Sequence, residues 1–159
     1  MVYEKNEYLP FSGDAQRLAA NLEQAYCFWL SARQSLKALP ASMYWAERAN
    51  KQYLCAKQKG TDKGTSLGSR NPQTEQQLTT FAEEKKQALE RAASANALVQ
   101  TRSILCRRMR MPTLPDKQAE ILRKLDIEGL LGTDLIVVGT NAFSAYEWTA
   151  NAIFPAGNE

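Results

Sequence analysis

The feature that most restricts the fold of this chain is the stretch from Gln73 to Met111, which contains neither glycine nor proline. Asn71 and Pro72 precede it, and they suit the N-cap and the first position of a helix. Apolar residues recur along the stretch at helical spacing, so we expect one long helix that ends near Arg110. Its expected buried stripe comprises Leu78, Phe81, Ala88, Leu89, Ala92, Ala95 and Val99.

A helix of this length needs a packing partner, because isolated helices are only marginally stable in water. The segment from about Asp14 to Leu39 supplies one, with Ser12 or Asp14 as cap and Pro40 as terminator. Its apolar residues at helical spacing are Leu18, Leu22, Ala25, Tyr26, Trp29 and Leu36. We expect the two helices to form a long antiparallel pair. The aromatic run 26–29 is interpreted as core rather than as a binding site, and residues 1–12 are expected to be irregular.

Residues 42–69 carry turn signals between short aromatic-rich segments. The turn signals lie at 49–51 and at 59–64, where asparagine, glycine and aspartate gather. The segments between them are rich in residues that suit a pleated surface. We expect a small three-stranded antiparallel meander with strands near 42–47, 52–58 and 64–68. A single helix over 43–59 is the alternative.

The pattern of the C-terminal part predicts a helix, a strand, a tight turn and a second helix. Prolines at 112 and 115 break the chain, and the following helix is expected from residue 115 or 116 to about 127, where Gly129 and Gly132 end it. The run 135–138 is apolar and β-branched, which favours a short strand buried on both faces. A turn on Gly139 and a helix from 140 or 141 to about Asn151 follow, and residues 154–159 are expected to be frayed.

Composition excludes several classes of site. The sequence has no histidine, which removes His-based catalysis and His metal ligands. Its three cysteines are widely spaced, and free buried thiols are the expectation. The net charge of +3 permits a nucleic-acid partner without requiring one. No run is apolar enough for a membrane span, and no signal peptide is apparent, so we expect a soluble, cytoplasmic protein.

Three segments together resemble a known family. They are Val138–Ala142 followed by Ala145–Glu147, then Ser66–Glu75, and Ile121–Leu125 followed by Gly129–Gly132. Their residues resemble motifs of a bacterial family of nucleotidyltransferase-fold proteins, a branch of the DNA polymerase beta-like superfamily. The resemblance implies a predominantly helical α+β protein. Residues 1–112 would be a helical platform that bears the meander, and residues 113–159 the start of an incomplete nucleotidyltransferase core.

The resemblance also implies a function, namely transfer of a nucleoside monophosphate from an NTP to an unknown acceptor with Mg²⁺. Gly139, Thr140 and Asn141 would face the nucleotide phosphates, and Arg70 would support a phosphate from the meander. The family's Asp-x-Asp metal pair has no counterpart, because Glu147 and Glu159 are the only acidic residues after the turn. We therefore assign no catalytic residue and no metal ligand, and we expect the chain alone to be inactive as a transferase.

Other interpretations stay open. The strand, turn and helix could form a corner without a ligand. The chain could instead be a non-enzymatic module that binds nucleic acid or a protein, with nucleic acid contacted by Lys51, Lys57, Lys59, Lys63, Arg107 and Arg108. Lysines that guard a sheet edge and arginines that complement a helix dipole would explain the same charges structurally. Self-association is expected as well, because a strand at 135–138 needs neighbours.

Overall fold

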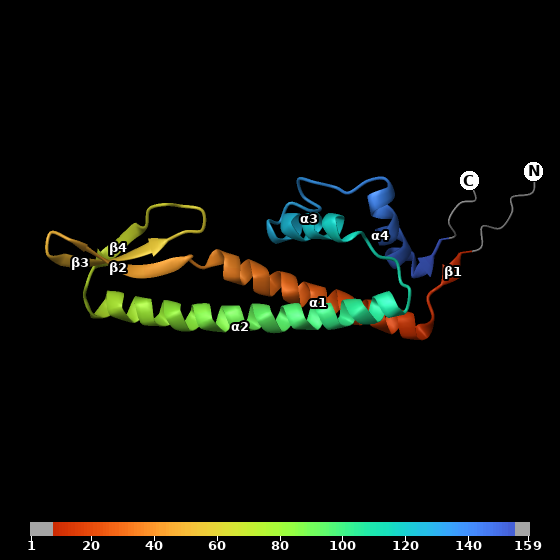
Figure 1. The fold of residues 1–159 in the computed structure, drawn as a ribbon, viewed down its shortest axis with the longest axis horizontal. Helices are drawn as coiled ribbons and strands as arrows, with labels where there is room; N and C mark the ends of the chain where they lie inside the picture. The colour runs from red at the N-terminus through yellow and green to blue at the C-terminus, as the bar shows by residue number, and fades with distance from the viewer. Residues whose placement is uncertain (1–7, 155–159) are drawn as a thin grey trace, which may run out of the picture. The chain divides into compact units, whose positions relative to one another are not determined.

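A computed structural model describes residues 8–154 of the chain, apart from the side chain of Asn141, and it is an α+β structure dominated by helices (Figure 1). The elements in chain order are β1 (Leu9–Pro10), α1 (Gly13–Ala38), β2 (Ser42–Arg48), β3 (Lys51–Lys57), β4 (Thr65–Ser69), α2 (Pro72–Arg108), α3 (Asp116–Ile127), α4 (Thr140–Ala150) and β5 (Ala152–Ile153). The predicted meander and all four predicted helices are confirmed within one or two residues at most ends.

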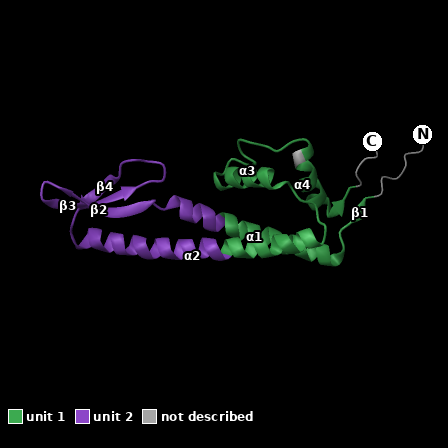
Figure 2. Cartoon of the chain, viewed as in Figure 1, with its two compact units in different colours: residues 1–30, 95–159 green, residues 31–94 purple. Residues whose placement is uncertain are grey.

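The chain divides into two compact units (Figure 2). Unit 1 comprises Met1–Leu30 and Ala95–Glu159, and unit 2 comprises Ser31–Ser94. The division crosses both long helices, so each unit holds part of α1 and part of α2. The predicted boundary at residue 112 separates a helical platform from a segment that resembles the start of a nucleotidyltransferase core. That division stays a prediction.

The meander of unit 2 is a three-stranded antiparallel sheet in the order β2-β3-β4. Its first hairpin has a two-residue loop, Ala49–Asn50, in which both residues have positive φ (49° and 60°). Such a loop matches the twist of the two strands that it joins. Leu54, on the central strand, is fully buried, with 0% of its surface exposed. The sheet thus has a local turn to set its register and a buried centre to hold it.

The start of α2 is fixed by a reciprocal pair of hydrogen bonds. The backbone N–H of Thr74 donates to Asn71 Oδ1 at 2.9 Å, and the backbone N–H of Asn71 donates to Thr74 Oγ1 at 3.0 Å. Two N–H groups that a helix start leaves unpaired are thereby satisfied. Thr74 is buried, and Asn71 is confirmed as the N-cap.

The end of α2 is a Schellman motif formed without glycine. Arg110 takes the left-handed conformation at φ 54°, and its N–H bonds to Arg107 O, while Met111 N–H bonds to Cys106 O. Met111 is buried against Cys106, which is the hydrophobic contact that accompanies this motif. The chain therefore leaves the helix in a direction set by packing before it reaches Pro112.

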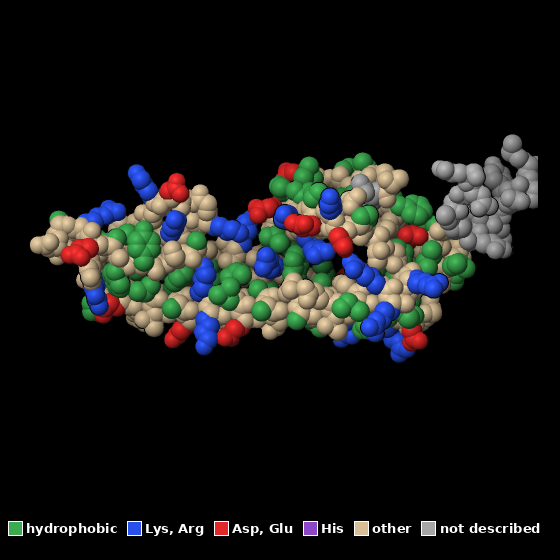
Figure 3. All heavy atoms as spheres, viewed as in Figure 1, with side chains coloured by type: hydrophobic (Ala, Val, Ile, Leu, Met, Phe, Trp, Pro, Cys, Tyr) green, Lys and Arg blue, Asp and Glu red, His purple; other side chains and the backbone are tan. Residues whose placement is uncertain are grey.

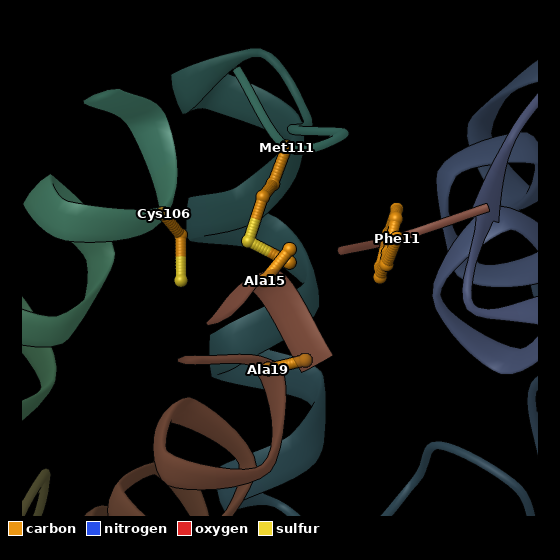
Figure 4. Packing of buried hydrophobic residues seen from close by; sticks show 5 residues of the cluster. All are labelled: Phe11, Ala15, Ala19, Cys106 and Met111. Atoms are coloured by element: carbon orange, nitrogen blue, oxygen red, sulfur yellow. The ribbon is translucent and has the colours of Figure 1, made fainter. Parts of the chain in front are cut away.

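The core of unit 1 lies where the start of α1 meets the end of α2. Phe11, Ala15 and Ala19 pack with Cys106 and Met111, as Figure 4 shows. In unit 2, by contrast, the end of α1 lies beside the first half of α2. Lys85 of α2 there donates to the backbone carbonyls of residues 40 and 41, which directly follow α1. Within each unit the two helices therefore run antiparallel, as predicted (Figure 1).

The predicted strand at 135–138 is wrong. Leu135 forms only an isolated bridge with Leu131, and Ile136 and Val138 are 80% and 68% exposed. The reason is a lack of neighbours among the described residues, because β1 pairs with β5 and the other strands pair within the meander of unit 2. An extended segment without a ladder partner does not become a buried strand. Figure 3 shows hydrophobic side chains on the surface of the segment between α3 and α4.

Several smaller expectations also need correction. Leu9 and Pro10, predicted as irregular, pair with Ile153 and Ala152 in a two-stranded antiparallel sheet, while residues 1–7 lie outside the described residues. Leu89, predicted in the buried stripe of α2, is half exposed. Of the three free cysteines, Cys27 is exposed rather than buried.

Phe154, predicted to be frayed, is instead held in place, because its N–H donates to Glu147 Oε1 at 3.0 Å and its ring packs on Phe143. Residues 155–159 of the predicted tail lie outside the described residues. Among the residues that the structure describes, no helix is both long enough and apolar enough to cross a bilayer.

Candidate functional site

The turn at Gly139 is the first candidate. Gly139 adopts φ 71° and ψ −150°, a combination that side-chain-bearing residues rarely adopt, and it immediately precedes α4. No side-chain group caps this helix start. Gly139 and Thr140 are exposed, and a Cβ on Gly139 would meet nothing within 4 Å. The glycine is therefore required by the backbone conformation and not by a neighbour in the described chain.

This turn offers unpaired N–H groups and the positive end of the dipole of α4, which suit a phosphate. Helix α4 begins at Thr140, as predicted. The third predicted contact, Asn141, has a side chain that lies outside the described part of the chain.

The surroundings of the turn do not fit the metal pair that the family resemblance implies. Glu147 is the only acidic residue of the described chain after Gly139, and it is 6% exposed. Its carboxylate accepts the N–H of Phe154 and so joins α4 to β5. Among the described residues, no three Cys, Asp or Glu side chains gather as metal ligands. Glu147 therefore has a structural role, and we derive no metal-dependent step for this chain.

Arg70 lies in unit 2 and is held by its neighbours. Its Nε donates to Glu75 at 2.7 Å, and its terminal nitrogen donates to Gln52 at 2.6 Å. Its guanidinium also lies 5.2 Å from the centre of the Trp45 ring. Two of its donors are thus already used in fixing β4 and α2 against β3. Its role in phosphate binding stays a prediction, and the Gly139 turn belongs to the other unit.

Lys51 and Lys57, the predicted nucleic-acid contacts on the strands of the meander, lie on one face of its sheet. Opposed residues of an antiparallel pair share a face, and successive residues alternate. Arg48 opposes Lys51, and Tyr44 and Lys57 follow on the same face, which also carries Tyr53. Trp45, and with it Arg70, belongs to the opposite face.

This basic face, defined by Tyr44, Arg48, Lys51, Tyr53 and Lys57, carries no acidic residue on its strands, since Glu47 points to the opposite side. Lys59 and Lys63 lie in the loop between β3 and β4 and are exposed.

The arginines at the end of α2 have partly structural roles. Arg107 pairs with Asp116 at 3.0 Å, which joins the last turn of α2 to the first turn of α3. Arg110 forms the left-handed C-terminal cap. Arg108 is exposed. Because two of these arginines have such roles, this cluster is a weaker candidate for a polyanion than the basic face of the meander.

The sequence does not single out an open cavity of unit 1, lined by side chains of all four helices. The interpretation of the aromatic run at 26–29 as core is confirmed only for the burial of Trp29, and Trp29 also lines the cavity. Cys27 and Phe28 are exposed instead, and Tyr26 is partly buried and lines the cavity as well. The sequence does indicate one wall of the cavity, because residues 26 and 29 lie one turn apart on one face of a predicted helix. It does not indicate the other walls, because they come from distant segments of the chain.

Comparison with known proteins returns no relative, since no family model, curated protein or solved structure matches the chain.

Proposed function

We propose that this chain is the nucleotide-side part of a nucleotidyltransferase-like protein, in which the Gly139 turn binds the phosphates of an NTP. The chain alone does not transfer a nucleotide. Its platform of α1 and α2 would support the catalytic part, which must supply the metal-binding carboxylates and the acceptor site.

The observation that carries this proposal is the Gly139 turn itself. An exposed glycine with φ 71° stands at an uncapped start of an eleven-residue helix. The residues around it also resemble the family motif. Thr140 adds a hydroxyl beside the backbone N–H groups, which is a suitable donor to a phosphate oxygen. The buried position of Glu147 supports the inactivity of the chain alone, because electrostatic stabilisation dominates phosphoryl transfer.

The test compares two glycines of the same segment. Gly139→Val should abolish ATP binding measured by calorimetry, because a valine strains the turn and covers its N–H groups. Gly132→Val is the matched control, since Gly132 also has positive φ (79°), is exposed, and would meet nothing within 4 Å if it carried a Cβ. Equal loss of binding in both variants, or no loss in Gly139→Val, would refute the assignment of the site.

A second candidate function is binding of single-stranded nucleic acid by the basic face of the meander. Three cations and two tyrosines share this face without an acidic residue, which suits phosphates and stacked bases. Lys51→Glu should weaken binding of a single-stranded RNA in fluorescence anisotropy and reduce its salt dependence. Lys86→Glu, an equal charge change at an exposed site of α2, should have a smaller effect. Equal effects would indicate attraction by net charge alone.

A further inference from the structure

Unit 1 contains an open cavity of about 1000 Å³ that neither the Gly139 turn nor the meander uses. Its walls come from α1, α2, α3 and α4, and it is distant along α4 from the turn, because Trp148 and Thr149 line it at the opposite end of that helix. Cavities that hold small organic ligands have volumes of roughly 300–1000 Å³. The space is therefore sufficient for a ligand with several rings.

Three of the lining residues are aromatic, and the polar atoms of two of them, Tyr26 and Trp148, are already engaged. The rings of Tyr26 and Trp29 lie 5.3 Å apart between centroids and are tilted by 31°. The Tyr26 hydroxyl donates to Asp126 at 2.7 Å, and Trp148 Nε1 donates to the carbonyl of Pro112 at 3.0 Å. With these two groups satisfied, the rings of Tyr26 and Trp148 present apolar surface to a ligand beside the ring of Trp29. Leu22 and Ile104 extend the apolar part of the lining.

The charged part of the lining is positive. Arg107 of α2 and Arg123 of α3 contribute cations, and Glu23 is the only carboxylate among the lining residues. Arg107 pairs with Asp116, but both side chains are more than half exposed, so the pair is weak and can be exchanged for a ligand. Arg123 takes part in none of the ion pairs found among the described residues. A guanidinium in this position favours a carboxylate, sulfonate or phosphate.

We propose that this cavity is a binding site for a small amphipathic organic anion. An apolar, preferably planar body lies among Tyr26, Trp29 and Trp148, and its anionic group is bound by Arg123, with Arg107 as the second cation. The site is separate from the proposed nucleotide turn, so either can fail without the other.

The fluorescent anion 8-anilinonaphthalene-1-sulfonate has this chemistry and is the probe of choice. Titration of the full chain should give one saturable site, with enhanced probe fluorescence and quenched tryptophan emission. Arg123→Gln should weaken binding about tenfold, as expected for the loss of one charged hydrogen bond. The neutral analogue N-phenyl-1-naphthylamine lacks the sulfonate, so its binding should be unaffected by Arg123→Gln.

A cavity-filling variant tests the location of the site. Ala20 lines the cavity and is exposed, so Ala20→Trp should fill the space and abolish saturable binding without removing a charge. Gln24→Trp is the control, because Gln24 is exposed on the same helix but does not line the cavity. The near-ultraviolet circular dichroism of each variant shows whether it is folded. No saturable binding, binding unchanged in Ala20→Trp, or equal weakening of both probes by Arg123→Gln would overturn the proposal.

Discussion

Two stretches of this chain that the sequence predicts as strands have different structures. The meander at Ser42–Ser69 forms a sheet with a buried centre, whereas the more apolar run at 135–138 has a single bridge and an exposed surface. Strand propensity favours both, since both are rich in residues that suit a pleated surface. The difference lies in the neighbours, because the meander's tight first turn and short loop give each strand a partner nearby in the sequence.

The comparison shows that propensity identifies a strand only where the chain also supplies a ladder. In the meander, Ala49–Asn50 turns the chain back immediately, and Leu54 is buried by the result. No other described strand pairs with the run at 135–138. The self-association expected from a strand at 135–138 stays a prediction.

The largest expected contrast between the two stretches is in hydrogen exchange. Amides of β3 should exchange only through global unfolding, with opening free energies of about 5–15 kcal/mol for a protein of ordinary stability. Amides of Ile136 and Val138 should exchange with opening free energies near zero. Exchange measured by NMR checks both sets in one sample. Strong protection at residue 136 would show that the segment is covered in solution, for example in a dimer.

Truncating a side chain to alanine should cost more free energy of unfolding in the meander than in the run at 135–138. Leu54→Ala should lower the free energy of unfolding by about 2–5 kcal/mol, because it leaves a cavity under a fully buried side chain. Ile136→Ala should change it by less than about 0.5 kcal/mol, because that side chain is 80% exposed. Urea denaturation of the two variants measures both values, and a large cost at Ile136 would contradict the exposed position.

Helix α3 has no buried residue and is held in part by a residue distant in the sequence. The hydroxyl of Tyr26 in α1 donates a hydrogen bond to Asp126 of α3. Burial, this hydrogen bond and the charge of Asp126 raise the pKa of Tyr26 above its ordinary value. Near pH 10 the unfolded chain releases the phenol proton while the folded chain keeps it, so stability falls as pH rises. The slope is at most about 1.4 kcal/mol per pH unit.

Tyr26→Phe removes this titration. The variant should lose less stability than the unmodified chain between pH 9 and pH 11. Urea denaturation at several pH values measures the difference in slope. Parallel curves for the two proteins would mean that the hydroxyl is not held by Asp126.

The smallest expected effect is a gain of stability in the meander's first turn. Ala49 has φ 49°, a conformation that costs a side-chain-bearing residue about 1–2 kcal/mol and glycine much less. Ala49→Gly should therefore stabilise the chain by a few tenths to about 1 kcal/mol, after the greater entropy of the unfolded glycine chain is subtracted. Ala46→Gly, within β2, should destabilise it. The two changes should shift the urea midpoint in opposite directions.

The parts of the fold that could be predicted from the sequence are those whose signals are local. Asn71 and Pro72 mark the start of α2, the turn residues at 49–51 mark the first hairpin, and Gly129 marks the end of α3. No local signal predicts the pairing of β1 with β5, which joins the two ends of the described chain.

The candidate sites also differ in whether local sequence signals predict them. The Gly139 turn is evident because glycine at a helix start is a local signal. The cavity is not, because Tyr26, Arg107, Arg123 and Trp148 are brought together only by the packing of four helices. The contacts of Arg70 with Gln52 and Trp45 depend on strand register, so its charge alone does not predict them.

The most direct test of the proposed function is calorimetric titration of the chain with ATP, with and without Mg²⁺. The Gly139 turn without partner carboxylates should bind ATP weakly, and Mg²⁺ should not tighten the binding. Tight binding that depends on Mg²⁺ would contradict the proposal, because it requires metal-binding carboxylates within the chain or across a dimer. Absence of binding would contradict it as well, and it would favour nucleic-acid recognition by the basic face of the meander.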